Sequence, residues 1–194
     1  LPVLHTEPVL LNSATVGAVL LALTGLLSAR WLYAHREKFA SYEMGAPLAA
    51  ILWSLAWWLY GGLAEVERSA SAQSLGASLS FAALTALALD RLGQRWSWPL
   101  QGPLALILTA AAGLTALLTG LSGSHPFAEA GWAGWGVWFA VLYRLLWRQE
   151  QQAGAEIREW LPRLHAAAFW LLAYLLARES AWQITQSISG IWGW

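Results

Sequence analysis

Five charged or titratable side chains in this sequence stand beside the ends of long apolar stretches. Glu65 and Arg68 follow one such stretch, His125 lies in a short polar segment, and Arg178 and Glu179 follow another stretch. A histidine that is oriented by a carboxylate can act as a general base. Carboxylates at a membrane edge can instead gather a proton or a cation, and a neighbouring arginine would keep such a carboxylate ionised. Both kinds of chemistry are therefore compatible with these residue types.

A purely structural explanation of the same residues competes with the chemical ones. Glu65 and Arg68 are three positions apart, so on a helix they form an i,i+3 ion pair worth about 0.2–0.5 kcal/mol. Glu179 would then face headgroup water. The residues alone leave three explanations open: a structural helix-end pair, a functional polar cluster at the outer rim, or contacts with other parts of the protein.

Several kinds of catalytic or metal site are excluded by residue content and motifs. The chain contains no cysteine, which excludes thiolate nucleophiles and cysteine metal sites. It contains no P-loop, GxSxG, HExxH or dinucleotide fingerprint. His125 and His165 are expected on opposite sides of a bilayer and cannot share a metal. We therefore expect no metal and no cofactor.

The composition indicates which environment surrounds the elements that carry these residues. Hydrophobic residues make up 58% of the 194 residues and charged residues 11%, against about 25% charged residues in soluble domains. So much apolar surface predicts a lipid bilayer as the solvent. The formal net charge of +0 argues against a nucleic-acid partner. The fifteen tryptophans are interpreted as interfacial anchors and packing residues.

The predicted fold class is all-α, a polytopic transmembrane bundle of about six membrane-spanning helices. A span needs roughly 20 mostly apolar residues, and extended strands are disfavoured because period-2 alternation is absent. The six stretches that meet or approach this length are 12–34, 44–64, 71–89, 99–121, 132–147 and 164–177. The last is expected to continue through Arg178 and Glu179.

The distribution of basic residues predicts the orientation of the bundle. Of the eleven Lys and Arg residues, nine lie in the last turns of the first, third and fifth stretches or after them, and only Arg68 and Arg178 lie on the other side. The positive-inside rule then places both ends of the chain on the non-cytoplasmic side.

Rows of small residues predict where helices pack against one another. Ser74, Ser78, Ala82 and Ala86 repeat every fourth residue and form one stripe, and Gly113 lies in a shorter row. Between helices in lipid, close contact of small residues replaces the hydrophobic effect as the main attraction.

Three stretches together resemble a known family: "LWSLAWWLYGGLAEVER" (52–68), "SHPFAEAGWAGWGVWFAVLYRLL" (124–146) and "RLHAAAFWLLAYLLARE" (163–179). They are similar to the large bacterial multi-pass membrane proteins grouped as domain-of-unknown-function family 2339. The resemblance implies a bacterial inner-membrane location and a longer protein with more helices, and it supplies no activity. The pattern positions that it highlights are Gly61, Gly62, Glu65, His125, Pro126, His165 and Glu179.

The functional expectation follows from the excluded chemistry and the packing rows. Because the chain begins with Leu1 and ends in "SGIWGW", residues 1–194 are interpreted as a single transmembrane helical module of a larger membrane protein. The favoured function is structural or scaffolding, in the cell envelope of a bacterium. The alternatives are a transporter or channel that uses the outer carboxylates, and a component of an envelope lipid- or glycan-modifying enzyme. The expected partners are the bilayer and further helices of the same protein or of other membrane subunits.

Overall fold

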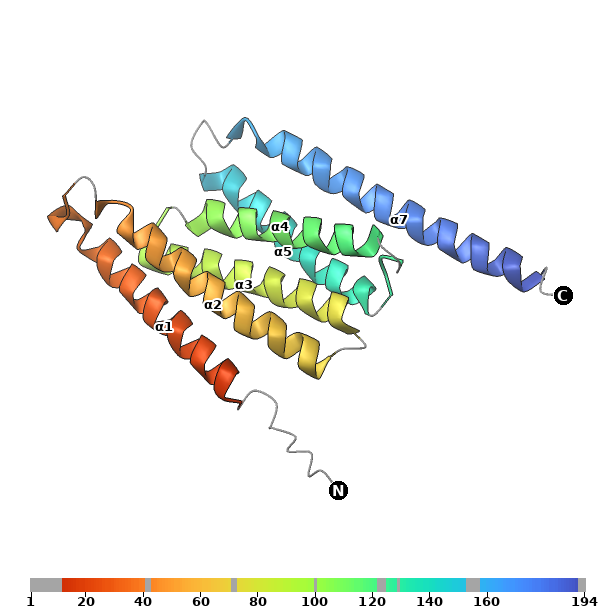
Figure 1. Cartoon of the computed structure of the whole chain (residues 1–194). Coiled ribbons are helices and arrows are strands. Elements are labelled where there is room, and N and C mark those ends of the chain that lie inside the picture. The colour runs from red at the N-terminus through yellow and green to blue at the C-terminus, as the bar shows by residue number, and fades with distance from the viewer. Residues whose placement is uncertain are drawn as a thin grey trace, which may run out of the picture. The chain divides into compact units, whose positions relative to one another are not determined.

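The computed structural model describes residues 12–40, 43–70, 73–99, 101–121, 125–128, 130–152 and 158–191. The described residues are mostly α-helical, as the sequence predicts, and no strand occurs among them (Figure 1). They fall into two compact units, divided after residue 71. Each unit is described by itself, and the single-module interpretation stays a prediction.

Unit 1 is a hairpin of two long helices, α1 (Ser13–Ala34) and α2 (Ala46–Ser69), with the short 3-10 helix η1 (Arg36–Lys38) in the connection (Figure 1). Small residues allow the two helices to approach closely. A Cβ on Gly61 would lie 2.6 Å from the Ala18 Cβ, and one on Gly25 would lie 3.0 Å from the Ser54 Cβ. The Ser54 hydroxyl also donates to the Ala22 carbonyl oxygen at 2.6 Å. The hairpin is therefore held by close contact and by a hydrogen bond to the backbone of the opposite helix.

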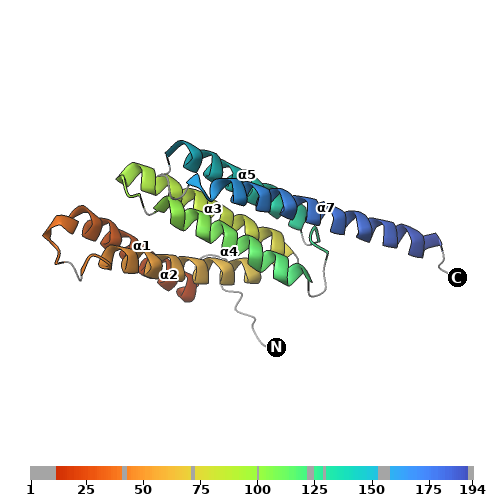
Figure 2. The ribbon, with the colours of Figure 1, turned by 90° about the horizontal axis from the view of Figure 1, so that it is seen from above.

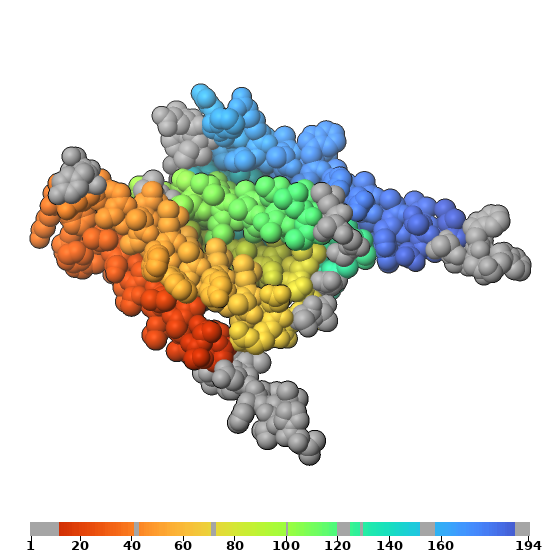
Figure 3. Space-filling model, in the orientation of Figure 1, coloured from red at the N-terminus to blue at the C-terminus, as the bar shows by residue number. Residues whose placement is uncertain are grey.

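Unit 2 contains α3 (Ser74–Trp96), α4 (Gln101–Leu121), α5 (Gly131–Gln152) and α7 (Leu161–Ile191). Helices α3, α4 and α5 pack on one another, and α7 lies along α5 (Figure 2). The backbones of α3 and α5 approach closely at two glycines, because a Cβ on Gly134 would lie 2.7 Å from both Cα and O of Gly76. The C-terminal part of α7 projects beyond the other helices of the unit, and most of its side chains from 177 to 188 are exposed (Figures 1 and 3).

The helix boundaries follow from local sequence. Asn12 caps α1 by accepting a hydrogen bond from the Thr15 amide at 2.8 Å, as its residue type favours. Pro47 lies in the first turn of α2, where a missing amide hydrogen costs little. Helix α3 ends at Trp96 and is capped by Ser97, which has a left-handed backbone with φ of 52°. Several helices extend beyond the predicted apolar stretches: α2 continues to Ser69 and α3 to Trp96.

Among the described residues, four helices are long and apolar enough to cross a membrane: α1, α2, α3 and α4. Helices α5 and α7 are long, but they do not reach this apolarity. Arg144 and Arg148 interrupt the apolar sequence of α5, and Arg178 and Glu179 interrupt that of α7. The structure therefore supports a helical protein with four candidate spans, and the two further spans belong to the proposal made below.

Candidate functional site

The Glu65 carboxylate is buried near the end of α2, with a relative exposure of 5%. Its Oε2 atom accepts three hydrogen bonds: from the Asn12 amide at 3.0 Å, from the Thr15 hydroxyl at 2.9 Å and from the Arg68 guanidinium at 2.6 Å. Asn12 and Thr15 belong to the start of α1, fifty or more residues earlier in the sequence. The same two residues are linked by a hydrogen bond from Asn12 Nδ2 to Thr15 Oγ1 at 2.8 Å.

This arrangement makes Glu65 a tie between the two helices of unit 1. Hydrogen bonds to a charged acceptor are about twice as strong as neutral ones, and a buried carboxylate needs such partners to stay ionised. The side chain of Arg68 is about half exposed, so the ion pair reaches the surface. The Oε2 atom already accepts hydrogen bonds from three protein donors. A catalytic base would instead need an oxygen that is open to a proton of the substrate.

In unit 2, His125 and Glu179 contact each other although they are 54 residues apart. The His125 Nδ1 atom lies 2.9 Å from the Glu179 Oε2 atom, and each side chain is about one fifth exposed. The imidazole stacks on the ring of Trp182 with a centroid separation of 4.1 Å and an interplanar angle of 22°. Gln183 donates to the other carboxylate oxygen, Oε1, at 2.7 Å. The segment between α4 and α5 is thereby attached to α7.

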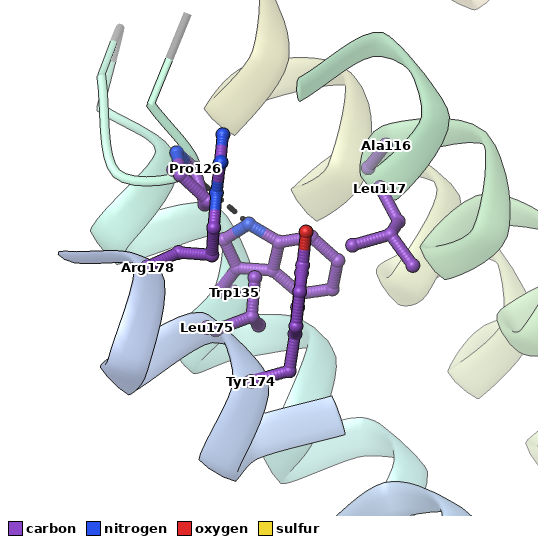
Figure 4. A pocket seen from close by; sticks show the side chains of 7 residues that line it. All are labelled: Ala116, Leu117, Pro126, Trp135, Tyr174, Leu175 and Arg178. Carbon is purple, nitrogen blue, oxygen red and sulfur yellow. Dashed lines mark hydrogen bonds between the residues drawn. The ribbon is translucent and has the colours of Figure 1, made fainter. Parts of the chain in front are cut away.

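Arg178 lies near this pair but takes part in a different contact. Figure 4 shows its side chain beside the indole of Trp135, next to Pro126, with Tyr174 of the same helix at the other side of the ring. The Trp135 indole N–H donates to the Pro126 carbonyl oxygen at 3.2 Å. Within the described residues no ion pair involves Arg178, and the space around Trp135 has no room for a water molecule. Of the two outer arginines, Arg68 pairs with an acid, and Arg178 has no such partner among the described residues.

The five residues of the expected outer-rim cluster are thus divided between the two units. His125, Arg178 and Glu179 belong to unit 2, where the first and last are in contact, and Glu65 and Arg68 form their own ion pair in unit 1. The gathering of all five at one site stays a prediction.

The sequence reasoning did not identify a second buried carboxylate, Asp90, which has a relative exposure of 1%. Asp90 on α3 forms an ion pair with Arg148 on α5, and Gln94 donates to its Oδ2 atom at 2.8 Å. The only available signal was that Asp90 continues the stripe of small residues on α3, which is expected to face a neighbouring helix. The partner could not be recognised from one sequence, because 58 residues separate Asp90 from Arg148.

Glutamines from α4 and α5 lie at the same end of unit 2 as this ion pair. Gln101 is fully buried and Gln149 is 8% exposed. A Cβ on Gly93 would lie 2.7 Å from the Gln101 Cβ, and one on Gly102 would lie 2.4 Å from the Gln149 Nε2. The two glycines therefore make the room that the glutamine side chains occupy.

The residues that were predicted to pack between helices differ in how deeply they are buried. Ala82 and Ala86 on α3 are buried, whereas Ser74 and Ser78 on the same stripe are half-buried. Gly113 is buried against the indole of Trp138, since a Cβ there would lie 2.4 Å from the Trp138 Cζ2.

The histidines do not form a metal site in the described part of the chain, where no group of three or more potential ligands comes together. His165 Nε2 lies 2.9 Å from Glu150 Oε1, and His35 Nδ1 lies 2.9 Å from the Trp31 carbonyl oxygen. In each of the four ion pairs and histidine–carboxylate pairs of the described residues, both partners lie in the same unit.

Comparisons with protein-family models, with curated proteins and with solved structures found no match to this chain. The likeness to family 2339 therefore remains a prediction that depends on the three sequence stretches.

Proposed function

We propose that this chain is a multi-pass helical module of a bacterial inner membrane, with a structural or scaffolding role in the cell envelope. In this proposal all six long helices cross the bilayer, with both ends of the chain on the non-cytoplasmic side. Helices α5 and α7 would cross with their charged residues near the interfaces, where arginine side chains can extend toward water. Membership of family 2339 is part of the same proposal.

The observation that supports this role is the use of the two buried carboxylates as ties between helices. Glu65 connects α2 to the start of α1, and Asp90 connects α3 to α5. Charged residues in membrane segments are costly and are retained either for function or for mutual pairing. Both carboxylates have partners on a second helix, which favours a structural use over ion transport.

A flux assay separates the scaffold from a transporter. The protein would be reconstituted in liposomes that contain a pH-sensitive dye, and a proton or sodium gradient would be applied. A scaffold gives the same flux as empty liposomes, and Glu65→Gln leaves that flux unchanged while lowering thermal stability. Flux well above the empty liposomes that disappears in Glu65→Gln would establish the transporter instead.

Labelling of single cysteines tests the proposed orientation, because the chain contains no cysteine of its own. Ala70→Cys, after α2, should react with an impermeant maleimide added to intact spheroplasts. Ser97→Cys, after α3, should react only after the membrane is opened. The reverse pattern, or equal labelling of both positions, would contradict the proposed sidedness.

One observation favours the enzyme alternative as a second candidate. His125 and Glu179 lie within hydrogen-bond distance, which is the arrangement that a general base with an orienting carboxylate requires. The test is turnover of a polyprenyl-linked sugar by the reconstituted protein, compared with that of Glu179→Gln. Loss of an orienting group for a general base would reduce an existing turnover by about 10²-fold or more. Equal turnover by the protein and by empty liposomes would remove this candidate.

A further inference from the structure

Unit 2 contains an apolar groove of about 220 Å³ between α4 and α7. Three residues of α5 that are largely removed from the surface form its floor: Trp138, Leu142 and Leu146. The walls come from α4 and α7, where several of the lining side chains are exposed. These lining residues are Leu106, Ala110, Gly113, Leu114 and Leu117 on α4, and Leu164, Ala167, Ala168 and Leu171 on α7.

The shape of the groove fits a chain rather than a compact ligand. Along α4 it extends from Leu106 to Leu117, which at 1.5 Å per residue is about 16 Å. This is roughly half of the 30 Å hydrocarbon thickness of a bilayer. The volume of 220 Å³ exceeds the roughly 150 Å³ of an apolar cavity that holds benzene but is below the 300 Å³ or more of sites for drug-sized ligands.

Every lining side chain is apolar, so the groove offers no hydrogen bond to its occupant. Its floor also presents no free polar atom, because the Trp138 indole N–H donates to the Thr109 carbonyl oxygen at 2.8 Å. Gly113 adds to the room, since its missing side chain leaves space for the Trp138 ring. The packing of a hydrocarbon chain suits such walls.

The end of the groove at Leu164 carries a different chemistry. Arg163 precedes Ala167 by four residues and so continues a lining row of α7 toward its N-terminus. Trp160 lies directly before the helix, and its carbonyl oxygen accepts a hydrogen bond from the Leu164 amide at 3.0 Å. The Arg163 guanidinium lies over the Trp160 ring at 4.6 Å from the centroid. Both side chains are exposed, and in the described part of the chain no carboxylate forms an ion pair with Arg163.

Glu150 on α5 is paired with His165 on α7 and forms no ion pair with Arg163. Glu150 lies 2.9 Å from the imidazole of His165, through its Oε1 atom. Tryptophan and arginine at the end of a membrane helix are typical of the headgroup level. By the proposed orientation this end lies at the cytoplasmic leaflet, where anionic lipids attract basic residues.

We propose that the groove holds one acyl chain of an anionic glycerophospholipid, whose phosphate is bound by Arg163 beside Trp160. The inference rests on the proposed membrane-spanning arrangement of α4, α5 and α7. The apolar groove accepts the chain of any phospholipid, and Arg163 supplies the preference for a net negative headgroup. The lipid would fill the space between α4 and α7, which protein side chains leave open.

The binding test uses native mass spectrometry of the detergent-purified chain, with dioleoylphosphatidylglycerol or dioleoylphosphatidylcholine added. We expect one retained phosphatidylglycerol and a preference over phosphatidylcholine of about fivefold, the effect of one basic residue near an anionic surface. Arg163→Gln should remove the preference, whereas Arg158→Gln, an exposed arginine before α7, should keep it. Equal binding of both lipids by the unmodified protein, or equal effects of the two variants, would overturn the assignment of the headgroup site.

The groove itself is tested with matched phenylalanine variants. Ala167→Phe and Ala110→Phe place a ring in the groove from opposite walls, and both positions are exposed enough to accept it. Ala166→Phe and Ala111→Phe are the controls, since these exposed neighbours do not line the groove. The first pair should lose the retained lipid and the second pair should keep it.

Equal lipid retention by both pairs would overturn the groove as the binding site. If Ala167→Phe instead breaks up a dimer while lipid retention is unchanged, the groove is an interface between copies and the proposal fails. Extraction of membranes with alkaline carbonate distinguishes this from failure of the proposed function. A protein that stays in the membrane but retains no lipid contradicts only the lipid site, and one that is extracted contradicts the membrane module.

Discussion

Removing one partner of the Asp90–Arg148 ion pair should destabilise the protein strongly, and removing both should not. Asp90 is 1% exposed, so in Asp90→Leu the charge of Arg148 loses its buried partner. Breaking a buried ion pair from one side costs about 3–5 kcal/mol. We expect the lower end of that range, about 3 kcal/mol, because the Arg148 side chain is itself 19% exposed and part of its charge stays hydrated. At roughly 2–4 °C per kcal/mol for a chain of this size, the Tm should fall by about 6–12 °C.

The double variant Asp90→Leu with Arg148→Met distinguishes a structural tie from a functional pair. Well-packed apolar residues can replace a buried ion pair with little loss or with a gain of about 1–4 kcal/mol, so the double variant should recover most of the Tm. Thermal unfolding in detergent micelles, followed by circular dichroism, measures both effects. Arg144→Met is the matched control, since this exposed arginine lies one turn earlier on α5. A double variant as unstable as Asp90→Leu, or an unchanged Tm in that single variant, would refute the reasoning.

Two further predictions concern glycine contacts and the tie of unit 1. Gly134→Ala should destabilise the protein by about 1–3 kcal/mol, because its Cβ would meet the backbone of Gly76, whereas Gly136→Ala, with open space around it, should stabilise it by about 0.5–1 kcal/mol. Melting curves of the two variants should therefore shift in opposite directions, and a shared direction would contradict the close α3–α5 contact. Glu65→Ala should cost about 1–3 kcal/mol, because the buried donors of Asn12 and Thr15 lose their acceptor while the half-exposed Arg68 stays hydrated. The exposed Glu67→Ala is the control, and equal losses in the two variants would contradict the role of Glu65 as a tie of the hairpin.

The helices could be predicted from the sequence because a span in lipid leaves a local pattern. A run of about 20 apolar residues is sufficient evidence for such a helix, and the cap residue Asn12 marks the start of α1 in the same local way. The helix ends that extend beyond the apolar stretches were harder to predict. Glu65 and Arg68 lie within α2 rather than after it, since both residue types favour helix formation and do not end a helix.

The contacts between helices could not be predicted to the same degree, because each joins positions far apart in the chain. Asn12 and Glu65 are 53 residues apart, and no pattern within either segment identifies the other. The small-residue stripe of α3 indicated a packing face, and Ala82 and Ala86 are indeed buried. A close backbone contact of α3 nevertheless occurs at Gly76, outside that stripe and opposite a glycine of α5.

Polar ties and the apolar groove have complementary roles in unit 2. The Asp90–Arg148 pair joins α3 to α5 near one end, and the His125–Glu179 contact joins the segment before α5 to α7. Between these ties, α4 and α7 leave a groove that no polar group crosses. In lipid, an apolar gap carries little penalty because acyl chains fill it, whereas an unpaired charge carries a large one. Such a bundle therefore needs polar contacts between helices only at a few positions, and acyl chains can fill the apolar space between them. It follows that substitutions at the ties should change stability in any detergent, whereas substitutions in the groove should change stability only when lipid is present.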